Sequence, residues 1–283
     1  MMVVCAVLWS TSGIIMKFIN WNAFLIAGGR AVFSTSIIAV STIKTGHKLK
    51  ITKMGLWAAL LSFLNVNCFI AANKLTTAAN SIVLQYTAPI FVLIITAFIL
   101  KKKLKVYEYA SVFLALVGMI LFFMDDMDMN GMLGNLLAVT SGFFMGIMMV
   151  LNGQIEDEGE RMTSILIGHG SVAVIGVPIG LILTDVQAIT GREILLVVFL
   201  GLFQLGIPYI LYGKAAGMIS AVACSLISMI EPMLNPVWVA LFYDEVPGRW
   251  ALVGAIIIIG AVVMYSVLDR EPEERVPADV EKP

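Results

Sequence analysis

Long apolar runs follow one another along almost the whole chain, and they constrain its fold more than any other feature. A helix needs about 20 predominantly apolar residues to cross the hydrocarbon layer of a bilayer. Runs of that length, separated by charged residues, Gly, Pro or Asn, predict ten spans with short connections. The predicted spans are Met1 to Ile19, Ala23 to Ile43, Met54 to Ala72, Ala78 to Leu100, Tyr107 to Met124, Gly131 to Leu151, Thr163 to Leu183, Ile194 to Gly213, Met218 to Tyr243 and Trp250 to Leu268.

The composition also favours a chain embedded in a lipid bilayer. Of the 283 residues, 60% are hydrophobic and 13% are charged, whereas a soluble domain carries about 25% charged residues. A soluble fold this apolar would expose large hydrophobic patches. The formal net charge of -1 provides no basic excess for a phosphate backbone, so we expect no nucleic acid partner. The three cysteines lie far apart in apolar runs, and we interpret them as reduced packing residues, with no metal and no cofactor.

Lys and Arg residues are distributed unequally between the two sides that these spans define. Such residues accumulate in short loops on the cytoplasmic side of a membrane. With the N-terminus inside, thirteen of the 18 Lys and Arg residues fall on the inner side, four fall on the outer side, and Arg30 lies within a span. We therefore predict a multi-pass protein of the plasma membrane with both termini in the cytoplasm. Residues 269–283, rich in Pro and charge, are predicted to form a disordered cytoplasmic tail.

The fourth and ninth spans resemble each other in sequence. The segment ANSIVLQYTAPIFVLIITAF, from Ala79 to Phe98, aligns with VACSLISMIEPMLNPVWVAL, from Val222 to Leu241, and Pro89 falls on Pro232. A glycine in each following span also aligns after a slip of one residue. Chance similarity between apolar segments is the alternative explanation.

A repeat of five helices places the starts of the two halves on opposite sides of the membrane. The repeat must therefore be inverted. We predict an all-α integral membrane protein with ten transmembrane helices, arranged as two inverted five-helix repeats over residues 1–127 and 128–268. Inverted repeats with Pro-interrupted helices are typical of transporters that expose a central site alternately to either side.

Several segments resemble a known family. The first span contains AVLWSTSGIIMKF, the second contains an arginine in LIAGGRAVF, and the chain ends in IEPMLNPVWVALFYDEVPGRWALVGAIIIIGAV. The whole pattern is similar to the EamA-type, ten-helix members of the drug/metabolite transporter superfamily. The resemblance implies export of small metabolites, often amino acids, by alternating access between two five-helix halves, and it does not specify the substrate.

Three ionisable side chains fall well inside predicted spans: Arg30, His169 and Glu231. Burying a charge at membrane depth costs at least about 2.5 to 3.5 kcal/mol, so each of them requires a reason. Glu231 can bind the amino group of a substrate or carry a coupling proton, and Arg30 can clamp a carboxylate. His169 can relay a proton. The alternatives are an ion pair between Glu231 and Arg30, snorkelling of Arg30, and a buried His169 bonded to a neighbouring carbonyl.

Neutral polar side chains at similar depth complete the predicted site, because polar groups in spans usually face the bundle interior. Helix-to-helix hydrogen bonding is the alternative role for any one of them. Pro89 and Pro232 are predicted to break the helices that form the cavity walls. The predicted substrate-binding residues are Trp9, Ser12, Arg30, Asn65, Gln85, Tyr86, Ser228, Glu231 and Asn235.

These features predict a secondary transporter that exports a small polar or amphipathic metabolite, such as an amino acid, with protons as a candidate coupling ion. The alternative within transport is proton-coupled efflux of lipophilic cations. We expect no enzyme, because the sequence contains no GxSxG or HExxH motif and no pair of intramembrane aspartates. No phosphate-binding loop occurs, so ATP is not the expected energy source. A monomer or a homodimer is compatible with ten helices.

Overall fold

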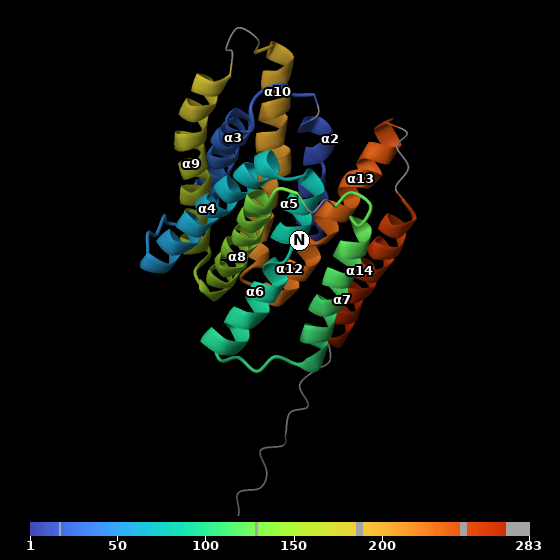
Figure 1. Ribbon diagram of the computed structural model, residues 1–283. Helices are drawn as coiled ribbons and strands as arrows, with labels where there is room; N and C mark the ends of the chain where they lie inside the picture. Colours follow the sequence, from blue (N-terminus) through green and yellow to red (C-terminus); the bar gives the residue numbers. More distant parts are fainter. Residues whose placement is uncertain (17, 128–129, 185–188, 244–247, 270–283) are drawn as a thin grey trace, which may run out of the picture.

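Helices make up the computed structural model, which describes residues 1–16, 18–127, 130–184, 189–243 and 248–269 and contains no strand in these ranges (Figure 1). The predicted tail lies almost entirely outside the described residues. The helices are, in chain order, α1 (Met2–Ser10), α2 (Ser12–Met16), α3 (Ala23–Lys44), α4 (Lys53–Leu75), α5 (Ala78–Gln85), α6 (Ala88–Ile94), the π-helix η1 (Ile95–Ile99), α7 (Val106–Phe122), α8 (Met132–Gln154), α9 (Glu158–Leu183), α10 (Gly191–Phe199), the π-helix η3 (Leu200–Gly206), α11 (Ile207–Ala215), α12 (Ala221–Ser228), α13 (Ile230–Tyr243) and α14 (Arg249–Leu268).

Seven helical runs within the described ranges are long and apolar enough to cross a membrane. Two shorter apolar helices, Val106–Phe122 and Ala221–Asn235, accompany them. Large apolar side chains also cover the outside of the bundle; Phe98 and Ile182, for example, are 77% and 83% exposed. The chain is therefore a multi-pass membrane protein. The seven runs are α3, α4, α5 to η1, α8, α9, α10 to α11, and α14.

The first predicted span is not one continuous helix, because α1 ends at Ser10 and α2 begins at Ser12. The hydroxyl groups of Ser10 and Thr11 donate hydrogen bonds to the carbonyls of Val7 and Leu8 at 2.6 and 2.8 Å. Side-chain bonds of this kind compete with the helical ladder and bend helices. The prediction of an unbroken helix was wrong at this point.

The fourth and ninth predicted spans are each broken at corresponding places. The first pieces, α5 and α12, are both eight residues long. Each begins after a hydroxyl side chain that caps it: Thr77 accepts from the Asn80 amide, and Ser220 accepts from the Ala223 amide. Such caps satisfy backbone donors that the first turn leaves unpaired.

Each of these two breaks lies a few residues before a proline. The chain leaves α5 at Tyr86 and α12 at Met229, and Pro89 and Pro232 stand in the first turn of the helices that follow. Proline has no N–H group and tolerates the first turn of a helix, where no partner is needed. The two helices thus bend at Tyr86 and Met229, a few residues ahead of Pro89 and Pro232.

The most extensive helix packing joins the first half of the sequence to the second: α3 packs on α9, α4 on α8, and α7 on α14 (Figure 1). Glycines permit the close approach in two of these pairs. A Cβ atom at Gly28 would lie 2.5 Å from the Val177 amide nitrogen, and one at Gly254 would lie 2.5 Å from the Phe122 nitrogen. Gly260, which the sequence alignment equated with Gly118, has open space where its Cβ would be.

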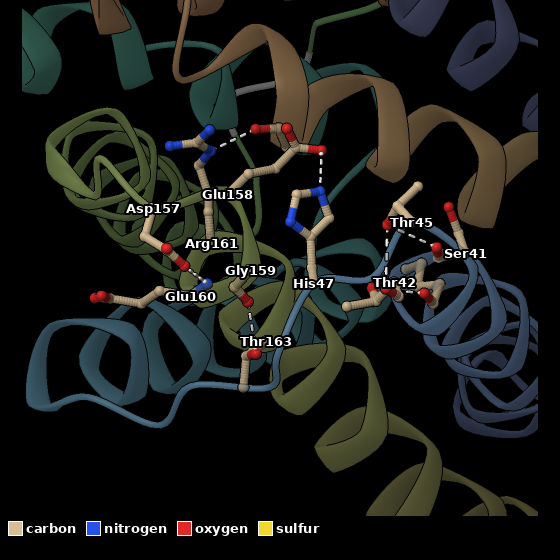
Figure 2. Close-up of polar contacts among 12 residues, drawn as sticks. Ser41, Thr42, Thr45, His47, Asp157, Glu158, Gly159, Glu160, Arg161 and Thr163 are labelled. Atoms are coloured by element: carbon tan, nitrogen blue, oxygen red, sulfur yellow. Dashed lines mark hydrogen bonds and ion pairs between the residues drawn. The ribbon is translucent and has the colours of Figure 1, made fainter.

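The start of α9 is five residues earlier than predicted and is held by side chains at one end of the bundle. Asp157 accepts from the Glu160 amide as the N-cap, which extends the helix beyond the apolar run. The buried Arg161 donates hydrogen bonds to the carbonyls of Gly213 and Ile155. Figure 2 shows this region, where Thr163 also bonds the Gly159 carbonyl at 2.6 Å.

Two loops meet at this end of the molecule through ion pairs. His47 Nε2 lies 3.4 Å from Glu158 Oε1 (Figure 2). Lys50 Nζ lies 2.8 Å from Asp157 Oδ2. The ammonium of Lys50 lowers the pKa of Asp157 by its hydrogen bond, and the carboxylate in turn raises the pKa of Lys50. We call this end the basic end, because ten of the described Lys and Arg residues lie there: Lys44, Lys48, Lys50, Lys53, Lys101, Lys102, Lys103, Lys105, Arg161 and Lys214.

The opposite end joins a different set of connections. The Asn20 amide donates to Glu193 Oε1 at 2.9 Å, and Thr76 Oγ1 donates to Asn135 Oδ1 at 2.7 Å. The last turns of α9 and α13 lie at the top of Figure 1, whereas the start of α7 and the end of α14 lie at the bottom. The described helices therefore run between the basic end and this opposite end.

Candidate functional site

A cavity of about 190 Å³ lies inside the bundle and contains most of the predicted site residues. Both halves of the sequence contribute to its wall, through α1 to α5 in the first half and through α8, η3, α11 and α13 in the second. The wall combines aromatic, amide and charged side chains with methionines, and we call it the central cavity. Its polar and aromatic lining consists of Trp9, Ser12, Asn65, Gln85, Tyr86, Gln204, Tyr209, Tyr212, Arg30 and Glu231, besides Phe69.

Arg30 is held at the cavity by a neutral amide. Its Nη1 donates to Gln204 Oε1 at 3.1 Å, and Gln204 Nε2 donates to the Trp9 carbonyl at 3.1 Å. Gln204 belongs to the π-helix η3, whose Gly201 allows close contact with the α3 backbone at Arg30. Buried Nε of Arg30 has no hydrogen-bond partner among the described residues. The guanidinium is thus positioned while retaining donors for an additional acceptor.

Glu231 is held at the cavity by Tyr86. The Tyr86 hydroxyl donates to Glu231 Oε2 at 2.8 Å. Glu231 is the second residue of α13, directly after the break at Met229, and Tyr86 occupies the break between α5 and α6. The two interrupted helices therefore meet through this hydrogen bond, and both breaks direct polar groups toward the central cavity.

Arg30 and Glu231 both line the central cavity, but they form no ion pair with each other. The two ion pairs among the described residues are His47–Glu158 and Lys50–Asp157 at the basic end. The alternative of a direct ion pair between Glu231 and Arg30 is thus not formed in this structure. Opposite charges that face one cavity from separate anchors can bind the two ends of a zwitterion.

An amide cluster forms another part of the wall. Gln85 Nε2 donates to Asn65 Oδ1 at 3.1 Å and to Ser141 Oγ at 2.9 Å, and the Ser141 hydroxyl is 2.7 Å from Asn65 Oδ1. Gly142 stands beside the Gln85 carbonyl, where its Cβ would approach to 2.5 Å. This close contact brings α8 against the break in the fourth span and fixes the orientation of Gln85.

His169 lies behind the cavity wall and does not line it. Its Nδ1 is 2.7 Å from Ser34 Oγ, and its ring packs edge-on against Tyr209 with centroids 4.2 Å apart. Tyr209 itself faces the cavity. The partner of His169 is thus a hydroxyl on α3 rather than the carbonyl expected from the sequence, and any effect of His169 on a ligand passes through Tyr209.

Two predicted substrate-binding residues lie outside the lining of the central cavity. Ser228 is buried, and its hydroxyl bonds the Ser225 carbonyl at 2.7 Å within the same helix. Asn235 lies a turn beyond Glu231 on α13, and its buried Oδ1 has no partner in the described part of the chain. A short hydroxyl side chain can satisfy itself on its own helix, so the burial of Ser228 requires no contact with the cavity.

Sequence reasoning missed several lining residues, among them Tyr209, Tyr212 and Met148. Aromatic and methionine side chains are as common in helix packing as in cavities, so these residue types do not indicate a site. Gln204 carried a signal, because it is a polar side chain deep in a span. In the described ranges, no group of three His, Cys, Asp or Glu side chains is placed to hold a metal ion.

A multi-pass helical bundle that encloses a polar, charged cavity has the build of a membrane transporter. The chain belongs to the EamA-like transporter family, which matches residues 1–124 and 132–267. This match confirms the resemblance seen in the sequence and is consistent with membership of the drug/metabolite transporter superfamily.

Individual relatives agree with this assignment. An uncharacterized transporter of Clostridium kluyveri is 28% identical over 246 residues, which cover 81% of this chain and 78% of the relative. An uncharacterized transporter of Archaeoglobus fulgidus is 22% identical over 264 residues, 93% of both chains. A solved crystal structure superposes with a TM-score of 0.82 over 94% of this chain and 96% of the other, at 16% identity, which shows a shared fold.

Proposed function

We propose that the protein is a secondary active transporter that exports a small zwitterionic metabolite, such as an amino acid. One observation carries the proposal: Arg30 and Glu231 face the same cavity without pairing. Each is held by a neutral partner, Gln204 for the arginine and Tyr86 for the glutamate. A ligand with a carboxylate and an ammonium group would therefore compensate both buried charges at once. The proposal assigns no catalytic step to the chain.

The size and lining of the central cavity support a small solute. Its volume of about 190 Å³ is below the roughly 300 Å³ at which pockets for drug-sized ligands begin. Trp9, Tyr209 and Tyr212 form a group of packed rings on one wall, with Trp9 and Tyr209 centroids 5.2 Å apart. Such a surface suits the apolar part of an amphipathic metabolite.

Alternating access between two inverted halves is the mechanism we propose, with ten membrane crossings. Seven long runs and two shorter apolar helices support this count, which the broken α1–α2 segment would bring to ten. The equal lengths and hydroxyl caps of α5 and α12 support the repeat, as do the two separate family matches. The two proposed repeats differ locally at Gly118 and Gly260, because the surroundings of these two glycines differ.

For orientation, we propose that the basic end faces the cytoplasm, with both termini on that side of the plasma membrane. Lys and Arg favour cytoplasmic loops, and ten described ones lie at that end. The central cavity is lined by residues of both halves of the chain, and we propose a monomer or a homodimer as the working state.

The first test is thermal unfolding of the purified protein in detergent against amino acids, nucleosides, sugars and organic cations. A ligand at about 100 times its dissociation constant adds roughly 2.7 kcal/mol of stability. We expect an amino acid to stabilise the wild type and Lys44→Gln, which removes an exposed charge at the basic end, but not Arg30→Gln or Glu231→Gln.

Substrate analogues then assign the two charges. Arg30→Gln should weaken binding of the amino acid and leave its decarboxylated amine unaffected, while Glu231→Gln should spare the N-acetylated acid. Flux through proteoliposomes with the same variants tests transport itself. If both variants bind and transport the amino acid as the wild type does, the proposed site is wrong.

Glu231 is also the group through which we propose coupling to protons, because it is the one carboxylate among the described residues that line the cavity. His169 would contribute only through Tyr209. A pH gradient should drive uptake into proteoliposomes by the wild type, and Glu231→Gln should transport at a rate that no longer responds to the gradient.

Efflux of lipophilic cations is the second candidate, favoured by Glu231 together with the aromatic rings of Trp9, Tyr86 and Tyr209. Arg30 opposes it, since a buried cation repels cationic substrates. Resistance of expressing cells to toxic dyes would support cation efflux, and stabilisation by organic cations alone in the unfolding panel would replace the first proposal with this one.

A further inference from the structure

A second cavity, of about 370 Å³, lies at the basic end of the bundle. Its wall comes from η1 and the loop that follows, the start of α7, the end of α8, and the connection between α11 and α12. We call it the basic-end cavity. Its lining mixes apolar side chains with six polar or charged ones, which are Thr96, Lys102, Lys103, Glu108, Gln154 and Ser220.

The basic-end cavity continues the line of the central cavity along the same helix faces. On α8, Met149 lines the central cavity, and Gly153 lines the basic-end cavity. On the segment that ends α11, Tyr212 and Ala216 repeat this relation. Residues four apart lie on one face of a helix, about 6 Å from each other along its axis. The two cavities are therefore successive spaces on one path through the bundle.

A packed layer separates the two spaces. Met149, Tyr212, Val92 and Met229 belong to one hydrophobic cluster and are at most 2% exposed. Val92 lies on α6 between the residues that line the two cavities, and Met229 is the bend between α12 and α13. Asn152 donates to the Tyr212 hydroxyl at 3.4 Å within this layer. The path is thus closed between the central cavity and the basic end.

Two lysines give the basic-end cavity a positive wall. Lys102 and Lys103 are exposed and form no ion pair in the described structure. The one carboxylate in the lining, Glu108, is mostly covered and accepts the Lys105 amide at 2.7 Å. With Lys101 and Lys105 beside them, the lysines leave an excess of positive charge over this single carboxylate.

We propose that the basic-end cavity is the inner mouth of the transport path, at which Lys102 and Lys103 receive the carboxylate of an arriving solute. This inference rests on the proposed function, and it adds a recognition site before the central cavity. The lysines raise the local concentration of anionic solutes at the mouth, as charges around a cleft do for their ligands. They thereby select carboxylate-bearing solutes before Arg30 and Glu231 bind them.

Cysteine labelling tests the proposal without a known substrate. In a full-length variant with Cys5, Cys68 and Cys224 replaced by Ala, Gly153→Cys places a thiol in the basic-end cavity. A Cβ at Gly153 meets only ordinary contacts, at 3.7 and 3.9 Å, so the variant should fold. Sealed vesicles of both orientations are treated with anionic 2-sulfonatoethyl methanethiosulfonate or cationic 2-(trimethylammonium)ethyl methanethiosulfonate, and the rates are compared.

We expect Gly153→Cys to react from the basic-end face of the membrane, and Met145→Cys, in the central cavity, to stay unreactive from that face because the packed layer lies between. At Gly153→Cys the ratio of anionic to cationic rates should fall about fivefold in the Lys102→Gln/Lys103→Gln background, which corresponds to roughly 1 kcal/mol of charge interaction. The matched pair Lys44→Gln/Lys48→Gln removes equal charge at the same end and should change the ratio by less than about twofold.

If the thiol of Gly153→Cys stays unreactive from the basic-end face, and that of Ala216→Cys does too, the proposal of an inner mouth is wrong. An equal fall in the rate ratio in both lysine backgrounds would overturn the role of Lys102 and Lys103. Labelling requires no transport, so these results can fail while the tests of Arg30 and Glu231 succeed, and the reverse.

Discussion

The contact between α7 and α14 leads to a sharp test, because two glycines of one helix differ in their surroundings. A Cβ at Gly254 would lie 2.5 Å from the Phe122 nitrogen and 2.7 Å from its Cα, so Gly254→Ala must push the two helices apart. Overpacking of this kind costs about 1 to 3 kcal/mol. Gly260→Ala meets nothing within 4 Å, and the better helix propensity of alanine should leave it neutral or up to about 1 kcal/mol more stable.

Both variants carry the same chemical change in the same helix, so their difference isolates the packing contribution. We expect Gly254→Ala to be less stable than Gly260→Ala by about 1 to 4 kcal/mol. Unfolding in mixtures of dodecyl maltoside and sodium dodecyl sulfate, followed by far-ultraviolet circular dichroism, measures both. Stabilities within about 0.5 kcal/mol of each other would refute the close packing of α7 on α14.

Three further predictions concern hydrogen bonds and one ion pair. Tyr86→Phe should weaken binding of the stabilising amino acid about three- to tenfold in calorimetry and lower stability without ligand by about 0.6 kcal/mol, the average for such bonds in a membrane; an unchanged affinity would contradict the role of the Glu231 hydrogen bond. Arg161→Met leaves two buried carbonyls without donors and should cost about 2 to 4 kcal/mol in the detergent assay, whereas Arg192→Met, near the opposite end, should cost less than about 1 kcal/mol. Because Lys50 lowers the pKa of Asp157, this pair stabilises the fold above the ordinary aspartate pKa of 3.8 and loses its effect as the pH falls further; the melting temperatures of wild type and Asp157→Asn should differ at pH 6 and converge toward pH 3, and a constant difference would contradict the ion pair.

The chemistry of the central cavity could be predicted from the sequence where burial has a high cost. Arg30, Gln85 and Glu231 are polar groups in apolar spans, and lipid offers them no partners, so an interior position follows. Their exact partners did not follow. Gln204 and Tyr86 hold the two charges apart, and this depends on how π-helix η3 and the α5–α6 break rotate their side chains into the cavity.

The positions of the helix bends were less predictable than the number of apolar runs. Prolines marked the interrupted fourth and ninth spans, but the bends fall at Tyr86 and Met229, where the chain has already left the preceding helix. The break at Thr11 has no proline and arises from hydroxyl groups that bond backbone carbonyls. Tyr209 and Met148 could not be identified because their residue types serve packing and binding equally well.

The pairing of α3 with α9, α4 with α8 and α7 with α14 has a consequence for the biogenesis of the protein. Residues 128–268 supply packing partners for nearly every helix in residues 1–127. The first half is therefore inserted before these partner helices have been synthesised. At about 5 to 20 residues per second, synthesis of the second half takes on the order of 10 to 30 seconds. During that interval the Arg30 guanidinium has no Gln204, and the nascent half depends on lipid, water or insertion machinery to shelter its polar faces.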